Sequence, residues 1–186
     1  MLWDREGKWN TAGTIDAALA ACRELGLRHL VVASNSGETV EGLLQRDLDG
    51  LSVICVTHQV GFKSAGVAER GEEMRAHLAD AGVQLLTTTH LLGGVDRALR
   101  LRFNGYYPPE IIADSLRMFG HGVKVCIEIA VMALDAGLIP HGVDVTCVGG
   151  RARGADTACV IRPAHSLAFF DTRVLEVICR PRPKVD

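Results

Sequence analysis

The stretch VVASNSGET at residues 31–39 places hydroxyl and amide side chains where a run of β-branched residues gives way to a helix-like pattern. Ser34, Ser36 and Thr39 can cap a helix, because their side-chain oxygens accept hydrogen bonds from its free N–H groups. The same turn can instead bind an anion, since a helix N-terminus offers N–H donors and the positive end of the helix dipole. This stretch alone leaves both interpretations open.

Two further apolar runs end in the same kind of residue. Thr57 and His58 end the run VICVTH, and Thr89 and His90 end the run VQLLTTTH. If the runs are parallel strands, their carboxyl ends lie along one edge of the sheet, where ligands of open α/β sheets bind. Three polar strand ends at equivalent positions favour a ligand site over three separate helix caps.

The residue types at this edge suit a phosphate group that is held without much positive charge. The hydroxyls of residues 34–39 can donate hydrogen bonds to it, and Gly37 lets the backbone approach closely. Asn35 adds an amide to this turn. Glu38 would repel a phosphate, so we expect its side chain to face a sugar hydroxyl or solvent.

The loop after residue 57 offers further candidates in His58, Gly61 and Phe62. Phe62 could stack on a flat ligand or could close the core, and Lys63 could be a cation of the site or be solvated. The imidazoles of His58 and His90 could be acid–base groups or could serve only as hydrogen-bond partners.

The loop at residues 149–157 brings Gly149, Gly150 and Asp156 to the end of another apolar run, together with two arginines. A flexible hairpin turn is the alternative interpretation of this loop. No carboxylate or cysteine stands at ligand spacing from the histidines, so the sequence predicts no metal site.

Alternation of apolar runs and helical patterns predicts an α/β fold with a mostly parallel sheet covered by helices on both faces. The link between residues 150 and 156 is too short for a crossover helix, so the flanking strands are predicted to form an antiparallel pair. No repeat or linker divides the chain, which predicts a single domain over residues 1–186. The predicted strands are 27–33, 51–57, 83–89, 143–150, 156–164 and 173–181, and the predicted helices are 11–25, 38–48, 71–82, 96–103, 108–119 and 123–136.

Composition excludes some classes of partner. A net charge of -2 gives no electrostatic reason to expect a nucleic acid or an anionic membrane, and Arg97, Arg100 and Arg102 are predicted to form a solvated helix face. Five of the six cysteines lie in apolar runs, which predicts buried free thiols. With a charged N-terminus that lacks an apolar targeting core, the expected location is the cytoplasm.

The strings VVASNSGET and VICVTHQVGF resemble the C-terminal domain of pyruvate kinase, in which a Thr-x-Ser-Gly-x-Ser turn grips the phosphate of a sugar bisphosphate effector. Ser34, Ser36, Gly37 and Thr39 match that turn, whereas the usual basic residues are replaced by an amide and a carboxylate. NTAGT, THQVGF, YYPPEIIADSLRMFGHGVKVCIEIAVMALDAGLIP and RGADTACVIRPAHS are similar to segments of a family of stand-alone proteins related to that domain, found in archaea and bacteria.

The resemblance implies a three-layer α/β/α sandwich of the pyruvate kinase C-terminal type, whose crevice holds flavin mononucleotide (FMN) in some members. The phosphate would lie on the 34–39 turn, and the ring would lie toward residues 58–62 and 149–157. Pyruvate kinase performs its chemistry in a separate barrel domain that 186 residues cannot include, so we expect no pyruvate kinase activity.

Three functions stay open from the sequence. They are an FMN protein, which could be an oxidoreductase, a non-enzymatic sensor of a phosphorylated metabolite, and an interaction scaffold. The expected partner is a phosphorylated small molecule, and the sequence decides neither a homo-oligomeric state nor a catalytic residue.

Overall fold

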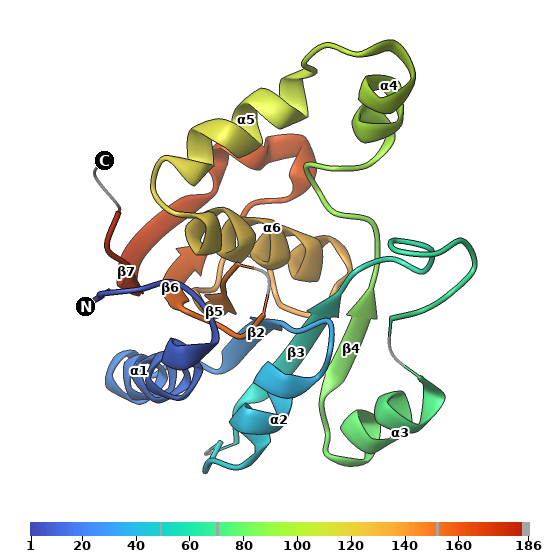
Figure 1. Cartoon of the computed structure of the whole chain (residues 1–186). Helices are drawn as coiled ribbons and strands as arrows, with labels where there is room; N and C mark the ends of the chain where they lie inside the picture. The colour runs from blue at the N-terminus through green and yellow to red at the C-terminus, as the bar shows by residue number, and fades with distance from the viewer. Residues whose placement is uncertain (49, 70, 152, 184–186) are drawn as a thin grey trace.

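The computed structural model describes residues 1–48, 50–69, 71–151 and 153–183, and these residues form three layers (Figure 1). The middle layer is a seven-stranded sheet with the order β1-β7-β6-β5-β2-β3-β4. The strands are β1 (Leu2–Trp3), β2 (His29–Ala33), β3 (Ser52–Thr57), β4 (Gln84–Thr87), β5 (Val145–Gly149), β6 (Thr157–Arg162) and β7 (Arg173–Pro181). The predicted α/β sandwich is thereby confirmed.

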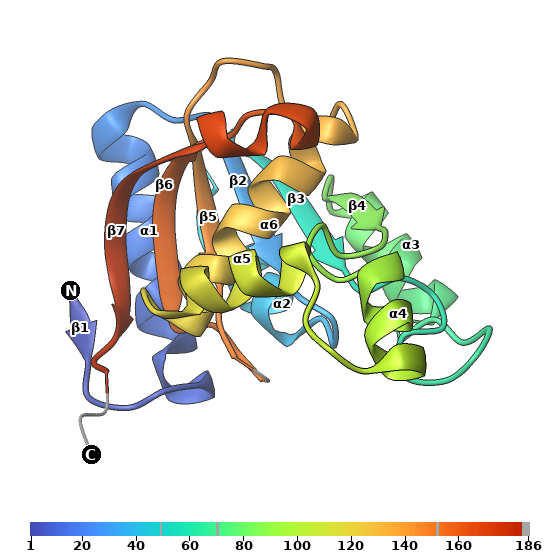
Figure 2. The same ribbon diagram turned by 90° about the horizontal axis from the view of Figure 1, so that it is seen from above.

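Helices cover both faces of the sheet, as Figure 1 and the view from above in Figure 2 show. One face carries α1 (Thr11–Leu25), α2 (Glu38–Leu44) and α3 (Glu72–Asp80), and the other carries α4 (Val95–Phe103), α5 (Pro108–Arg117) and α6 (His121–Asp135). Two short 3₁₀ helices, η1 (Lys8–Asn10) and η2 (Ser166–Asp171), precede α1 and β7. Each face has its own apolar core, and α6 is buried along almost its whole length.

The direction of the strands fixes where a ligand can bind. β2, β3, β4 and β5 are parallel, and the chain returns from β4 at the edge of the sheet to β5 on the opposite side of β2. Ligands of open α/β sheets bind at such a reversal, outside the carboxyl ends of the strands. The predicted antiparallel pair is confirmed, since β5 and β6 run in opposite directions with Gly149 opposite Thr157.

Several boundaries differ from the prediction. α2 ends at Leu44 rather than at residue 48, because Gln45 leaves the helical conformation and the Arg46 N–H bonds to the Leu43 carbonyl at 3.0 Å. β4 ends at Thr87 rather than at residue 89, because its pairing with β3 stops at Thr87. α6 begins at His121 rather than at residue 123, after Gly120. β1 was not predicted, because two residues in a charged segment carry no strand pattern.

All six cysteines are buried free thiols, which confirms the prediction made for five of them. Burial raises the pKa of Cys126 and Cys147 well above the ordinary value, so their thiols stay protonated at neutral pH. Among the described residues, no helix is both long and apolar enough to cross a membrane.

Candidate functional site

A cleft of about 530 Å³ opens at the carboxyl ends of β2 and β3, and α6 lines it from His121 to Met132. This volume lies within the range of small-molecule sites, which is about 300–1,000 Å³. Nine of the predicted residues line the cleft: Ser34, Asn35, Ser36, Glu38, Thr39, Thr57, His58, Phe62 and Gly150. The other five, Gly37, Gly61, Thr89, Gly149 and Asp156, are not among its lining residues.

The polar side chains of the 34–39 turn have two roles: some stabilise the turn, and others are exposed to the cleft. Ser34 is buried, and its hydroxyl accepts a hydrogen bond from the Val40 N–H at 3.4 Å, which is the helix-capping role. Gly37 has a φ of 98°, a left-handed conformation in which a side chain is strained. Ser36 and Glu38 are exposed at the cleft, so both can meet a ligand.

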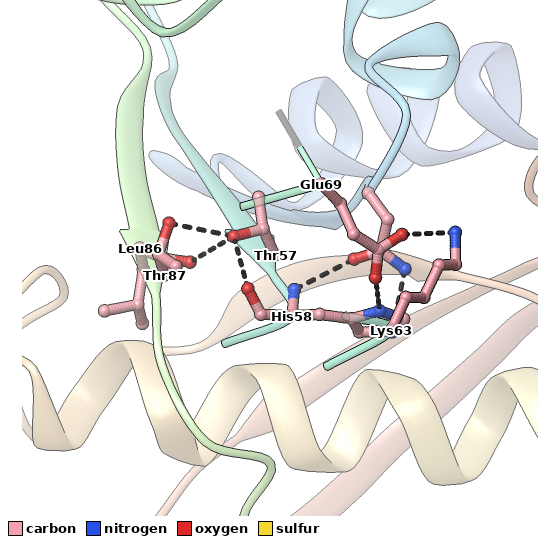
Figure 3. Close-up of polar contacts among 7 residues, drawn as sticks. Thr57, His58, Lys63, Glu69, Leu86 and Thr87 are labelled. Carbon is pink, nitrogen blue, oxygen red and sulfur yellow. Dashed lines mark hydrogen bonds and ion pairs between the residues drawn. The ribbon is translucent and has the colours of Figure 1, made fainter. Parts of the chain in front are cut away.

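His58 is held by hydrogen bonds on both sides of its ring. Its backbone N–H donates to Asn35 Oδ1 at 3.0 Å, which directs Asn35 Nδ2 toward His58 Nε2 at 2.8 Å. Because the Asn35 amide donates to Nε2, the ring proton lies on Nδ1 and is donated to Glu69 Oε1 at 2.5 Å (Figure 3). These contacts fix the orientation of the His58 ring at the edge of the cleft.

Glu69 also pairs with Lys63, whose Nζ lies 2.6 Å from Glu69 Oε2 (Figure 3). Burial tends to raise the pKa of Glu69, but hydrogen bonds from Lys63 and His58 outweigh it and lower the pKa overall. Lys63 is therefore engaged by a carboxylate while most of its side chain stays exposed.

The rings of His58, Phe62 and His90 lie against one another and form an aromatic wall of the cleft. The His58 ring lies 3.9 Å from the Phe62 ring and 4.8 Å from the His90 ring, measured between centroids, and Arg97 lies 5.5 Å from the Phe62 centroid. Burial above all lowers the pKa of His90 to about 4, so its ring is neutral at pH 7. His90 Nδ1 is buried and has no hydrogen-bond partner among the described residues.

Thr57 connects strand ends at the floor of the cleft. Its Oγ1 lies 2.9 Å from Thr87 Oγ1 (Figure 3). Arg75 Nη1 donates to the same Thr87 oxygen at 3.0 Å. Thr89 lies beyond the end of β4 and is exposed. The Thr57 hydroxyl therefore takes part in holding β3 to β4.

The 149–157 loop is shaped by close packing. A Cβ on Gly150 would lie 2.9 Å from the Gly154 carbonyl oxygen, so the loop has no room for a side chain at this position. Asp156 is buried and accepts hydrogen bonds from the Gly7 N–H at 2.8 Å and the Thr157 hydroxyl at 2.9 Å. The Asp156 carboxylate thus joins the start of the chain to β6. Ala152 of this loop lies outside the described residues.

The sequence did not predict a group of titratable residues that also line the cleft. They are Arg97, Arg117, His121, Lys124 and Glu128, whereas Arg153 is one of the two arginines expected from the 149–157 loop. Lys124 and Glu128 form a buried ion pair, and the Leu92 N–H donates to Glu128 Oε1 at 3.0 Å. Burial above all lowers the pKa of His121. The only sequence signal was the i, i+4 spacing of Lys124 and Glu128 on an apolar helix.

Within the described part of the chain, no three His, Cys, Asp or Glu side chains lie close enough together to hold a metal ion. The arrangement instead offers hydroxyls and an exposed carboxylate on the 34–39 turn, an adjoining aromatic wall with a neutral imidazole, and the Lys124 cation on α6. Such a cleft can bind an elongated molecule that has one anionic end and one flat end.

Comparison with known proteins gives one family and several structures. Residues 13–161 match the family described as pyruvate kinase, alpha/beta domain. A crystal structure of pyruvate kinase from Cryptosporidium parvum is similar at 13% identity and a TM-score of 0.43, over 82% of this chain and 22% of that one. A structure of the enzyme from the same organism in complex with ADP is similar at 12% identity and a TM-score of 0.40, over 89% of this chain and 23% of that one. This chain therefore spans roughly a fifth of the length of those pyruvate kinases.

Proposed function

We propose that this chain, which belongs to the pyruvate kinase alpha/beta domain family, binds FMN in the cleft at the carboxyl edge of its sheet. The observation that carries the proposal is the chemical division of the cleft between a hydroxyl-bearing turn and an aromatic wall. FMN has the same division, with one phosphate, a ribityl chain rich in hydroxyls and a flat apolar ring.

The phosphate would lie against the 34–39 turn. Ser36 would donate a hydrogen bond from its hydroxyl to the phosphate, and Gly37 has no side chain that would block the approach of the phosphate to the backbone. Glu38 would accept hydrogen bonds from ribityl hydroxyls. Arg153 would add positive charge from the opposite loop.

The ring would lie against Phe62 and the histidines. His90 fits this role, because its buried Nδ1 lacks a partner among the described residues and a neutral imidazole can hydrogen-bond a carbonyl or an N–H of the ring. When bound, FMN supplies electron-transfer chemistry, and nearby cations favour its reduced form. An FMN protein of this kind would be suited to an oxidoreductase activity.

The test compares FMN with riboflavin, which lacks the phosphate, by equilibrium dialysis of the purified protein. Ser36→Ala should weaken FMN binding, because a hydrogen bond to a charged group contributes about 1.5–3 kcal/mol, and should leave riboflavin binding unchanged. Phe62→Ala should weaken both ligands. Ser64→Ala, in the same loop but not lining the cleft, is the matched control. Absence of FMN binding at micromolar concentration would refute the proposal.

A second candidate is a sensor of a phosphorylated metabolite. The favouring observation is the presence of Arg117, Lys124 and Arg153 in the cleft, since cations on facing walls can bind two separate phosphates. The same dialysis with a sugar bisphosphate decides between the two. Tighter binding of the bisphosphate than of FMN would favour the sensor.

A further inference from the structure

A second cleft, also of about 530 Å³, lies where the N-terminus of α6 meets the C-terminal end of β7. Figures 1 and 2 both show the turn between α5 and α6 beside this end of β7. A hydrogen bond of 2.6 Å from Arg180 Nη1 to the Phe119 carbonyl joins the two segments. The predicted ligand residues on the 34–39 turn are absent from its lining.

Arginines dominate the walls of this cleft. Four of them come from three separate segments of the chain: Arg117, Arg151, Arg180 and Arg182. Guanidinium groups bind phosphate oxygens through paired N–H donors, which makes such a cluster suited to phosphate rather than to a single halide ion.

The acidic groups in the same cleft are already engaged. Arg151 pairs with Glu6 at 3.4 Å, and Arg117 forms an ion pair with Asp114. The Asp156 carboxylate accepts the two hydrogen bonds described above.

Arg180 and Arg182 form no ion pair with any carboxylate in the part of the chain that the structure describes. Once the two ion pairs are set aside, these two arginines outnumber the one remaining carboxylate, Asp156, whose hydrogen bonds come from neutral donors, so the cleft retains a net positive charge. A ligand with negative charge would neutralise it.

The start of α6 adds donors to the arginines. Gly120, His121 and Gly122 line the cleft, and the first turn of this 15-residue helix contains no acidic residue and no side-chain cap. The first N–H groups of a helix have no partner within it. A Cβ on Gly122 would lie 2.1 Å from Thr157 Oγ1, so the helix begins in direct contact with β6.

We propose that this second cleft is an anion site that binds a small phosphorylated molecule, separate from the FMN cleft. Guanidinium groups on β7 and on the 149–157 loop would hold the phosphate oxygens, and the first turn of α6 would add N–H donors. Arg117 and His121 line both clefts, so a ligand in one is adjacent to residues of the other.

The experiment titrates the whole chain with inorganic pyrophosphate by isothermal calorimetry. The test variant is Arg180→Gln with Arg182→Gln, because neither residue lines the FMN cleft and neither has a carboxylate partner among the described residues. We expect the double variant to weaken pyrophosphate binding by about tenfold, and added salt to weaken binding to the wild-type protein. FMN binding should be unchanged, which separates this proposal from the proposed function.

Two control variants locate the anion. Arg102→Gln with Arg173→Gln removes the same charge outside both clefts and should leave the affinity unchanged. Lys63→Gln with Arg153→Gln changes only the first cleft and should leave the affinity for pyrophosphate unchanged. Equal weakening in the 102/173 variant would show a general charge effect, and equal weakening in the 63/153 variant would place the anion in the first cleft. Either result, or no saturable binding to the wild-type protein, overturns the proposal.

Discussion

The buried ion pair between Lys124 and Glu128 allows a quantitative test of how the wall of the cleft is built. Lys124 is 7% exposed and Glu128 is 2% exposed, so neither charge is solvated. Lys124→Met would leave the Glu128 carboxylate buried, with the Leu92 N–H as its one remaining donor among the described residues. Removing one partner of a buried pair costs about 3–5 kcal/mol, because the remaining charge is uncompensated.

That loss is large compared with the whole free energy of unfolding, which is about 5–15 kcal/mol for a domain. Urea unfolding followed by circular dichroism would show it as a midpoint lowered by roughly 2 M, since m is about 1–3 kcal/mol/M. The double variant Lys124→Met with Glu128→Gln should recover most of the loss, because no buried charge remains and the Gln carbonyl still accepts the Leu92 N–H.

An exposed pair in the same chain provides the control. Arg117 and Asp114 are 40% and 56% exposed, so Arg117→Met should cost less than about 1 kcal/mol. The reasoning fails if Lys124→Met costs no more than this control. It also fails if the double variant is as unstable as the single one.

Two further predictions concern the residues around the first cleft. The pKa of His90 is about 4 in the folded protein, chiefly because of burial, and an unfolded chain binds this proton near pH 6.5. Stability should therefore fall as the pH drops below about 6.5, and the wild-type protein should lose about 2 kcal/mol more than His90→Asn between pH 8 and pH 5, measured by urea unfolding at each pH. Gly37→Ala should lower the free energy of unfolding by about 1–2 kcal/mol, because φ at this residue is 98°; a loss within the error of the urea titration would contradict the strained turn.

The sequence predicted the strands well where apolar runs are long and bounded by polar residues. β2, β3, β5 and β6 all lie within their predicted ranges. The ends of α2 and β4 were less predictable, since an amphipathic or apolar pattern continues past the point where tertiary packing stops. β1 is held only by its contact with β7, which no local pattern reveals.

The sequence predicted only the part of the candidate site that is formed by residues at the ends of strands. Residues 34–39 and 57–62 follow their strands directly, so the parallel sheet alone brings them together. Lys124 and Glu128 reach the cleft because α6 crosses the other face of the sheet, and their sequence positions are far from the strand ends they meet. Asp156 was expected at the ligand, but its partner is the Gly7 N–H, 149 residues away, which no spacing rule predicts.

The charges that line the first cleft favour a ligand with one phosphate over a ligand with two. Lys63 is paired with Glu69, and Lys124 is paired with Glu128, so a phosphate could gain either cation only by separating it from a carboxylate. Arg97 lies over the Phe62 ring, at the end of the cleft where a flat group would bind. Arg117 is likewise paired with Asp114, which leaves Arg97 and Arg153 as the arginines of the cleft without an ion pair among the described residues, and Arg97 already contacts the Phe62 ring. A sugar bisphosphate would need a second such cation, whereas the single phosphate of FMN would not.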